Sequence, residues 1–219
     1  MAARPTLFTM PISHYCVAAE RMLTFKQVAP ELVRVPYHDK RELIRRTGQD
    51  YVPALVWDDT VVPWSEIPRW LESKVPSPPL FPPGQEGVAA TLENWGHQVL
   101  EERVWRAIVT HLPAVLADDH ERWVFEEMQS RSRGPFSVLA MREPEFREEL
   151  AEYLAIVDRM LDGRAWVLGE PSVADFGIYG ALSPLLTAGE SLPANLANLC
   201  RWADHIARLT AGSAPALTR

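Results

Sequence analysis

Cysteine is scarce in this chain of 219 residues, which contains only Cys16 and Cys200. Neither has a second cysteine at the spacing of a metal-ligand pair, and a disulfide framework is excluded. The six histidines do not occur at HxH or HxxxH spacing, the arrangements that place two imidazoles on one strand or helix face. We therefore expect no bound metal.

Long apolar runs and basic clusters are also missing. The uncharged stretch from Phe176 to Gly189 is broken by Ser183 and Pro184 and is too short to cross a bilayer. Residues 1–15 contain no apolar run followed by a cleavage site, as a secretory signal would. The 22 Lys and Arg residues face 29 Asp and Glu residues, which does not favour nucleic acid as a partner. We expect a cytoplasmic protein without membrane or nucleic-acid partners.

Prolines, in contrast, are concentrated between Ser73 and Gly84, where five occur within a short stretch. Such a stretch cannot continue a helix and favours an extended backbone. The sequence therefore predicts a first domain over residues 1–75, a linker over 76–84 and a second domain over 85–219.

The first segment alternates short apolar runs with helical patterns. Strands are predicted at residues 7–10, 32–35, 54–57 and 60–62, and helices at 16–25, 39–47 and 65–72. Gly48 is placed to close the second helix, and Ser65 to cap the third. The order is β-α-β-α-β-β-α.

The second segment is helical throughout. Apolar residues recur at spacings of three and four from Phe146 to Leu161, and again from Leu199 to Leu209. Residues 86–117 are long enough for one extended helix, and residues 130–135 are predicted to form a loop. No internal repeat is present.

Three local motifs accompany this element order. Residues 11–16 read Pro-Ile-Ser-His-Tyr-Cys after the first strand, residues 51–55 read Tyr-Val-Pro-Ala-Leu, and residues 169–176 read Gly-Glu-Pro-Ser-Val-Ala-Asp-Phe. In the last motif, Ser172 and Asp175 have the spacing of a capping box, a structural feature that starts a helix. Together the motifs and the element order resemble the glutathione transferase family over nearly the whole chain.

The resemblance implies an α/β plus all-α fold, with a thioredoxin-like N-terminal domain and a glutathione-transferase-like helical C-terminal domain. It also implies a homodimer and glutathione as co-substrate. In the family, the turn after the first strand delivers a Ser, Cys or Tyr side chain to the sulfur of glutathione, which points to Ser13 or Cys16. Val52 and Pro53 match the family's thiol-binding turn, in which the proline follows a cis peptide.

The chemistry expected at this turn is stabilisation of a thiolate. A free thiol has a pKa of about 8.5, so only a small fraction is ionised at neutral pH. A hydroxyl that donates to the sulfur, and the positive end of the following helix, both favour the anion. Ser13 is therefore the expected activator. Cys16, in the first turn of the helix, is either a second reactive group or a buried apolar filler.

The chain departs from the family before the third helix. Pro63 and Trp64 stand where an acidic residue and a serine usually bind the γ-glutamyl group of glutathione. Trp64, Ser65 and Glu66 are the remaining candidates for that contact, and another small thiol is an open alternative. The second substrate is expected between the domains, near Trp95, Trp105 and Arg106.

The sequence thus predicts an enzyme, a glutathione transferase that activates a small thiol for attack on a hydrophobic electrophile. Two alternatives stay open. One is a non-catalytic binding or scaffold protein of the same fold, and the other is a glutaredoxin-like thiol oxidoreductase that uses Cys16.

Overall fold

A four-stranded sheet forms the centre of the first part of the chain in the computed structural model, which describes residues 4–211. The strands are β1 (Thr6–Thr9), β2 (Glu31–Arg34), β3 (Ala54–Trp57) and β4 (Thr60–Pro63), in the order β2-β1-β3-β4. β2 runs parallel to β1, whereas β3 is antiparallel to β1 and β4 to β3.

Helices cover both faces of this sheet. They are α1 (His14–Phe25), α2 (Arg41–Thr47) and α3 (Ile67–Lys74). Because neighbouring residues of a strand point to opposite faces, Leu7 of β1 packs in the main core with α1 and α3, while Phe8 packs with Leu43 of α2 on the other side. Gly48 closes α2 with a φ of 73°, as predicted.

The predicted cap at Ser65 is wrong. A 3-10 turn, η1 (Trp64–Glu66), precedes α3, so that Ser65 lies inside this turn and Glu66 occupies the N-cap position. Residues 75–85, which contain the prolines, form neither helix nor strand. The division into domains at this segment stays a prediction.

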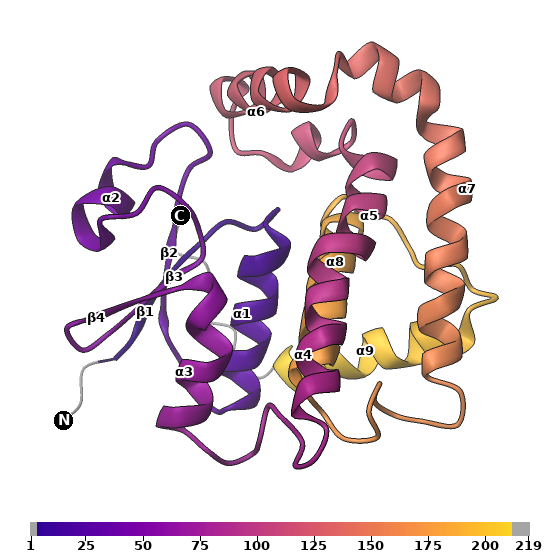
Figure 1. Ribbon diagram of the computed structural model, residues 1–219. Helices are drawn as coiled ribbons and strands as arrows, with labels where there is room; N and C mark the ends of the chain where they lie inside the picture. Colours follow the sequence, from indigo (N-terminus) through magenta and orange to yellow (C-terminus); the bar gives the residue numbers. More distant parts are fainter. Residues whose placement is uncertain (1–3, 212–219) are drawn as a thin grey trace.

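The rest of the described chain is helical, and Figure 1 shows it packed beside α1 and α3. Its elements, in chain order, are α4 (Glu86–Trp95), the π-helical turn η2 (Gly96–Leu100), α5 (Glu101–Ile108), the 3-10 turn η3 (Leu112–Val115), α6 (Asp119–Arg133), α7 (Phe136–Met160), α8 (Val173–Thr187) and α9 (Ala197–Ala211). Among the described residues, no helix is both long and apolar enough to cross a membrane.

Two boundaries in this part differ from the prediction. The helix expected over residues 86–117 ends at Ile108, and Pro113, which disfavours a continued helix, lies in the first turn of η3. The loop expected at residues 130–135 is shorter, since α6 continues to Arg133 and ends at Gly134, whose φ is 97°.

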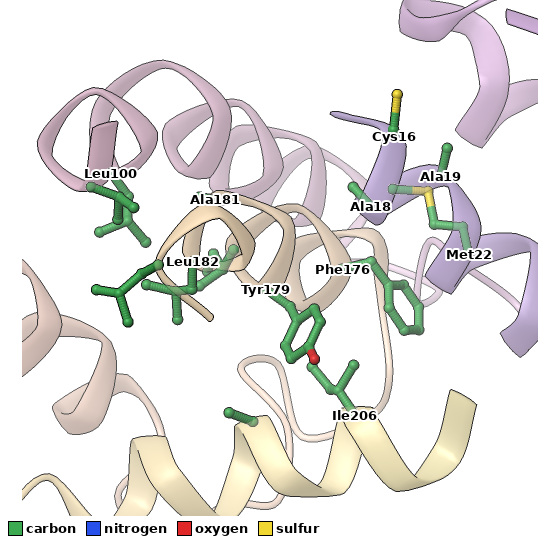
Figure 2. Packing of buried hydrophobic residues seen from close by; sticks show 14 of the residues in the cluster. Cys16, Ala18, Ala19, Met22, Leu100, Phe176, Tyr179, Ala181, Leu182 and Ile206 are labelled. Atoms are coloured by element: carbon green, nitrogen blue, oxygen red, sulfur yellow. The ribbon is translucent and has the colours of Figure 1, made fainter. Parts of the chain in front are cut away.

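Helix α8 lies at the centre of the core, and every residue from Val173 to Leu185 is buried. Figure 2 shows Phe176 and Tyr179 of α8 among residues of α1 and α9. Ser172 and Asp175 form a capping box at its start, in which the Ser172 amide donates to Asp175 Oδ2 at 3.0 Å. Asp175 also accepts from Trp202 Nε1 at 2.9 Å, which ties α8 to α9.

Candidate functional site

The turn between β1 and α1 places a hydroxyl at the start of a helix. Ser13 is the N-cap of α1, and its Oγ accepts a long hydrogen bond of 3.5 Å from the amide of Cys16. The side chain is partly exposed, and the hydroxyl proton is not used by that bond. Ser13 can therefore donate to an anion that also meets the positive end of α1.

Cys16 lies one turn further along α1 and points into the protein. Its exposed fraction is 0%, and burial raises the pKa of the thiol to about 12. Hydrogen bonds with the Ser13 side chain and the Met10 backbone lower the pKa of the thiol, but by less than burial raises it. A thiol in this state is protonated at neutral pH, and thus a poor nucleophile.

Ser13 opens into a pocket of about 260 Å³ between the sheet domain and the helices. We call it the Ser13 pocket. The segments that line it are the β1–α1 turn, the loop after β2, the turn before β3, α5 and α6; the lining residues are Met10, Ile12, Ser13, His14, Tyr37, Lys40, Tyr51, Val52, Glu101, Trp105, Met128, Gln129 and Arg133.

The Val52–Pro53 peptide, on the sheet side of the pocket, is cis. Val52 lines the Ser13 pocket, while Pro53 is buried behind it. Among the predicted site residues, Ser13, Val52 and Trp105 are thus brought together around one cavity.

A chain of hydrogen bonds crosses the α6 side of this pocket. The indole Nε1 of Trp105 donates to Gln129 Oε1 at 3.0 Å, and Gln129 Nε2 donates to the hydroxyl oxygen of Tyr37 at 3.0 Å. Tyr37 also packs edge-on against Phe125 of α6, with ring centroids 5.1 Å apart. Sequence reasoning missed Tyr37 and Gln129, since neither belongs to a local motif.

Glu121 of α6 holds the loop that carries Tyr37. Its buried carboxylate accepts from the Tyr37 amide at 2.7 Å, from the Ala117 amide at 2.9 Å and from Arg34 Nη2 at 3.3 Å. The first and third of these bonds join the helical part of the chain to the sheet domain. Figure 1 shows α6 above the gap between α2 and α5, where this contact is made.

The charges around the Ser13 pocket favour an anionic ligand. Lys40 and Arg133 line it with positive groups, and Arg133 is held by Glu102 at 2.7 Å. Burial raises the pKa of Glu101 to about 7, and burial lowers the pKa of His14 to about 3. Near pH 7 His14 is therefore neutral and Glu101 is only partly ionised, so Glu101 opposes the two cations less than an ordinary carboxylate would.

The other predicted binding residues lie elsewhere. Ser65 and Glu66 are exposed. Trp64 packs against Tyr15 in a tilted arrangement, with ring centroids 4.1 Å apart, and lines a separate, narrow pocket beside His97. None of these three residues lines the Ser13 pocket.

Trp95 and Arg106 also face away from Ser13. Trp95 stacks on Tyr153 of α7, with ring centroids 6.4 Å apart. Arg106 forms ion pairs with Glu102 at 3.1 Å and Glu149 at 3.6 Å, and lines a pocket of about 410 Å³ between α5, α6 and α7. Arg133 lines this pocket and the Ser13 pocket, so it stands between them.

The family comparison agrees with this geometry. Residues 7–79 match the model of the glutathione S-transferase N-terminal domain. The chain carries a glutathione S-transferase N-terminal domain. The β1–α1 turn, Tyr37, Lys40 and the Val52–Pro53 peptide all belong to this matched segment.

Solved structures with a glutathione-transferase-like fold cover almost the whole chain. A glutathione S-transferase of Ceriporiopsis subvermispora, solved with glutathione, has a TM-score of 0.78 at 16% identity over 99% of this chain and 100% of that chain. Glutaredoxin 2 of Salmonella typhimurium, also solved with glutathione, has a TM-score of 0.77 at 20% identity over 96% of each chain.

A third structure, a glutathione S-transferase of Methylobacterium radiotolerans in complex with glutathione sulfonate, has a TM-score of 0.67 at 24% identity over 99% of both chains. These likenesses confirm the predicted fold, a thioredoxin-like N-terminal domain followed by a helical C-terminal domain. A search of curated protein sequences finds no match.

Proposed function

We propose that this chain binds glutathione in the Ser13 pocket and activates its thiol for attack on a hydrophobic electrophile. The observation that carries the proposal is the position of Ser13, whose hydroxyl stands at the N-terminus of α1 and at the wall of a cavity. Three structures of similar fold were solved with glutathione or glutathione sulfonate. They support glutathione as the thiol in this proposal.

In the proposed reaction, the Ser13 hydroxyl donates to the sulfur, and the positive end of α1 lowers the energy of the thiolate. Each unit by which the pKa of a bound thiol falls corresponds to about 1.4 kcal/mol. Lys40 and Arg133 provide positive charge for the carboxylates of the tripeptide. The indole of Trp105 supplies apolar surface for the electrophile.

Cys16 has a structural role in this proposal. Disulfide exchange requires an accessible thiolate, whereas burial keeps the Cys16 thiol protonated and away from water. Glutaredoxin-like chemistry at Cys16 is therefore not favoured by the site. A purely binding function would keep the pocket but give no thiol-dependent turnover.

The first prediction tests the activator. Ser13→Ala should lower kcat for conjugation of glutathione to benzyl chloride by about 10-fold to 1,000-fold, because the pKa of the bound thiol rises and a smaller fraction of it is thiolate at neutral pH. The pKa of bound glutathione, followed by thiolate absorbance, should rise at the same time.

Cys16→Ala serves as the control and should keep the wild-type pKa of the bound thiol. Full turnover by Ser13→Ala would remove the proposed activator. No heat on titration of the wild type with glutathione or an S-alkyl glutathione at millimolar concentration would remove glutathione itself.

A further inference from the structure

The pocket of about 410 Å³ between α5, α6 and α7 is built from three helices, and each of them contributes one arginine to its lining. Arg106 comes from α5, Arg133 from α6 and Arg142 from α7. We call this cavity the arginine pocket. Because Arg133 also lines the Ser13 pocket, the two cavities share a wall at this side chain.

Helical spacing gathers the lining residues of α5 and α7. In α7, Leu139, Arg142 and Phe146 follow one another at spacings of three and four, and in α5 Arg106 and Val109 are three residues apart. Side chains at these spacings lie on a common face of a helix. Since α5 packs against α7, the two faces meet at the cavity.

The charges in the lining favour an anion. Glu102 is shared between two arginines, with Oε1 at 3.1 Å from Arg106 Nε and Oε2 accepting from Arg133 Nη1 at 2.7 Å. The third, Arg142, donates by Nε to the exposed Glu145 at 2.8 Å. The described lining thus holds three guanidinium groups and one carboxylate. Each guanidinium has five N–H groups, so donors remain for a ligand.

The floor of the arginine pocket is apolar. Val109, Leu139 and Phe146 are buried there. The guanidinium carbons of Arg142 and Arg106 lie 4.8 Å and 5.5 Å from the centre of the Phe146 ring, which is within the range of cation–π contacts. A cavity with an apolar floor and a cationic rim matches a ligand with an apolar body and an anionic head.

We propose that the arginine pocket binds amphipathic organic anions, in which an apolar ring system carries a carboxylate, and that such an anion weakens ligand binding in the Ser13 pocket through Arg133. The ring system packs on Leu139 and Phe146, and the carboxylate accepts from the arginines. The binding itself is independent of the proposed function. The coupling rests on the proposed function, since it requires glutathione in the Ser13 pocket.

Arg133 couples the two cavities by its charge. The proposed function uses this guanidinium for the carboxylates of glutathione, and an anion in the arginine pocket draws on the same group. Each ligand therefore lowers the affinity for the other, and the factor is the same in both directions. Because the sites are separate, the affinity for glutathione falls to a constant lower value. Direct competition for one site would have no such limit.

The second prediction uses 1-naphthaleneacetate as the probe and 1-naphthaleneacetamide as its uncharged counterpart. Calorimetry and ligand-observed NMR on the full-length protein should give a Kd of about 10 µM to 1 mM for the acid. The amide should bind about 10-fold more weakly, because it forms no charge-assisted hydrogen bonds. At saturating acid, the Kd for glutathione should rise about 5-fold and then stay constant.

Two variants test the location of the site. Arg142→Gln and Arg106→Gln should each raise the Kd for the acid by about 5-fold to 10-fold, because each removes a charged donor. Neither residue lines the Ser13 pocket, so the Kd for glutathione alone should equal that of the wild type. Circular dichroism checks that both variants are folded.

Arg131→Gln is the matched control for the loss of one charge. Arg131 is exposed on α6, forms an ion pair with Glu127 at 3.3 Å and lines neither of the two pockets. This variant should bind the acid with the wild-type Kd.

Two further variants separate the pockets. Lys40 lines the Ser13 pocket alone, so Lys40→Gln should weaken glutathione binding and leave the Kd for the acid unchanged. Arg133→Gln should weaken the binding of both ligands. It should also remove the rise in the glutathione Kd that the acid causes.

The outcomes distinguish this inference from the proposed function. A wild type that does not bind the acid at millimolar concentration, or that binds the acid and the amide equally, overturns the inference whatever its affinity for glutathione. An unchanged Kd for the acid in folded Arg142→Gln and Arg106→Gln overturns the site, as does a loss of acid binding in Lys40→Gln. A wild type that binds the acid but not glutathione supports the arginine pocket and overturns the coupling together with the proposed function.

Discussion

Glu93 is a carboxyl group that folding withdraws from water. Glu93 lies on α4, close to α8. A Cβ atom added at Gly177 of α8 would lie 3.0 Å from the Cα and the Cγ of Glu93. Burial raises its pKa from an ordinary value of 4.5 to about 7, and the positive charge of Arg69 offsets only part of that effect. The folded state therefore binds this proton more tightly than the unfolded state does.

The third prediction follows from the sign of that shift. The contribution of Glu93 to the free energy of unfolding is complete below pH 4.5 and is lost as the pH rises through about 7. Glu93→Gln keeps the shape and removes the charge, so it should equal the wild type near pH 4.5 and exceed it at pH 8. We expect a difference at pH 8 of about 2 kcal/mol, less than the full shift because water reaches part of the side chain.

Urea unfolding at the two pH values measures this difference. Glu126→Gln, an exposed position on α6, is the control and should show the same small change at both. If Glu93→Gln is no more stable than the wild type at pH 8, the carboxyl group is better hydrated than its surroundings indicate.

Some residues of the candidate site could be predicted from the sequence and others could not. Ser13 and Val52 belong to short motifs next to strands, so local pattern locates them. Tyr37 and Gln129 are 92 residues apart in the sequence, and their bond exists only because α6 lies over the loop after β2. Trp95 was expected near the substrate, but periodicity alone does not show which helix face meets the cavity.

At the scale of elements, α8 and α1 lie close together at Gly180. An added Cβ at Gly180 would lie 2.7 Å from the carbonyl oxygen of His14 and 2.9 Å from the Cβ of Ala18. Figure 2 shows Ala18 of α1 beside this part of α8. The absence of a side chain at Gly180 thus lets the start of α1, with Ser13 before it, lie against the helical part.

The fourth prediction is that Gly180→Ala lowers the free energy of unfolding by about 1–3 kcal/mol, because the backbone of α1 must shift to admit the methyl group. Thermal unfolding measures the loss. The same shift moves the Ser13 turn, so the affinity for glutathione should fall as well.

Gly87→Ala is the matched control for the same chemical change. Gly87 lies in α4 with nothing within 4 Å of an added Cβ, and alanine there should raise the stability by about 0.5–1 kcal/mol. Equal effects of the two variants would show that α8 and α1 are not in close contact.

Elements were predicted well where the signal is local. The strand at residues 54–57 and the C-cap at Gly48 follow from alternation and from glycine at a helix end. The start of α3 and the end of α5 differ from the prediction, since hydrophobic spacing shows neither the 3-10 turn at Trp64 nor the helix end at Ile108. The sequence also does not predict that the glycines of α8 lie against α1 and α4, because the residues that they contact are distant in the sequence.

At the scale of the whole molecule, Glu121 joins the two parts of the chain. Its carboxylate is 2% exposed and satisfies two backbone amides and Arg34. Breaking this contact leaves buried donors unpaired, which costs more than the bonds themselves contribute.

The fifth prediction is that Glu121→Ala lowers the free energy of unfolding by about 1–3 kcal/mol and weakens glutathione binding, since the loop with Tyr37 and Lys40 loses its anchor. Urea unfolding and calorimetry measure the two effects. Glu126→Ala, on the exposed side of the same helix, should change the stability by less than about 0.5 kcal/mol. Unaltered affinity in Glu121→Ala would show that the loop keeps its position without α6.

The π-helical turn η2 joins α4 to α5 in a continuous helical segment that runs from the proline-rich linker to the Ser13 pocket. This turn sets the directions in which the side chains of α5 point. Each residue of an α-helix advances the direction of its side chain by about 100°. Gly96, in η2, lies against Gly177 of α8, and further along the same segment Glu101 and Trp105 line the Ser13 pocket. Deleting one residue from η2 would turn α5 by about 100° about its axis relative to α4, so that side chains other than Glu101 and Trp105 would face the Ser13 pocket.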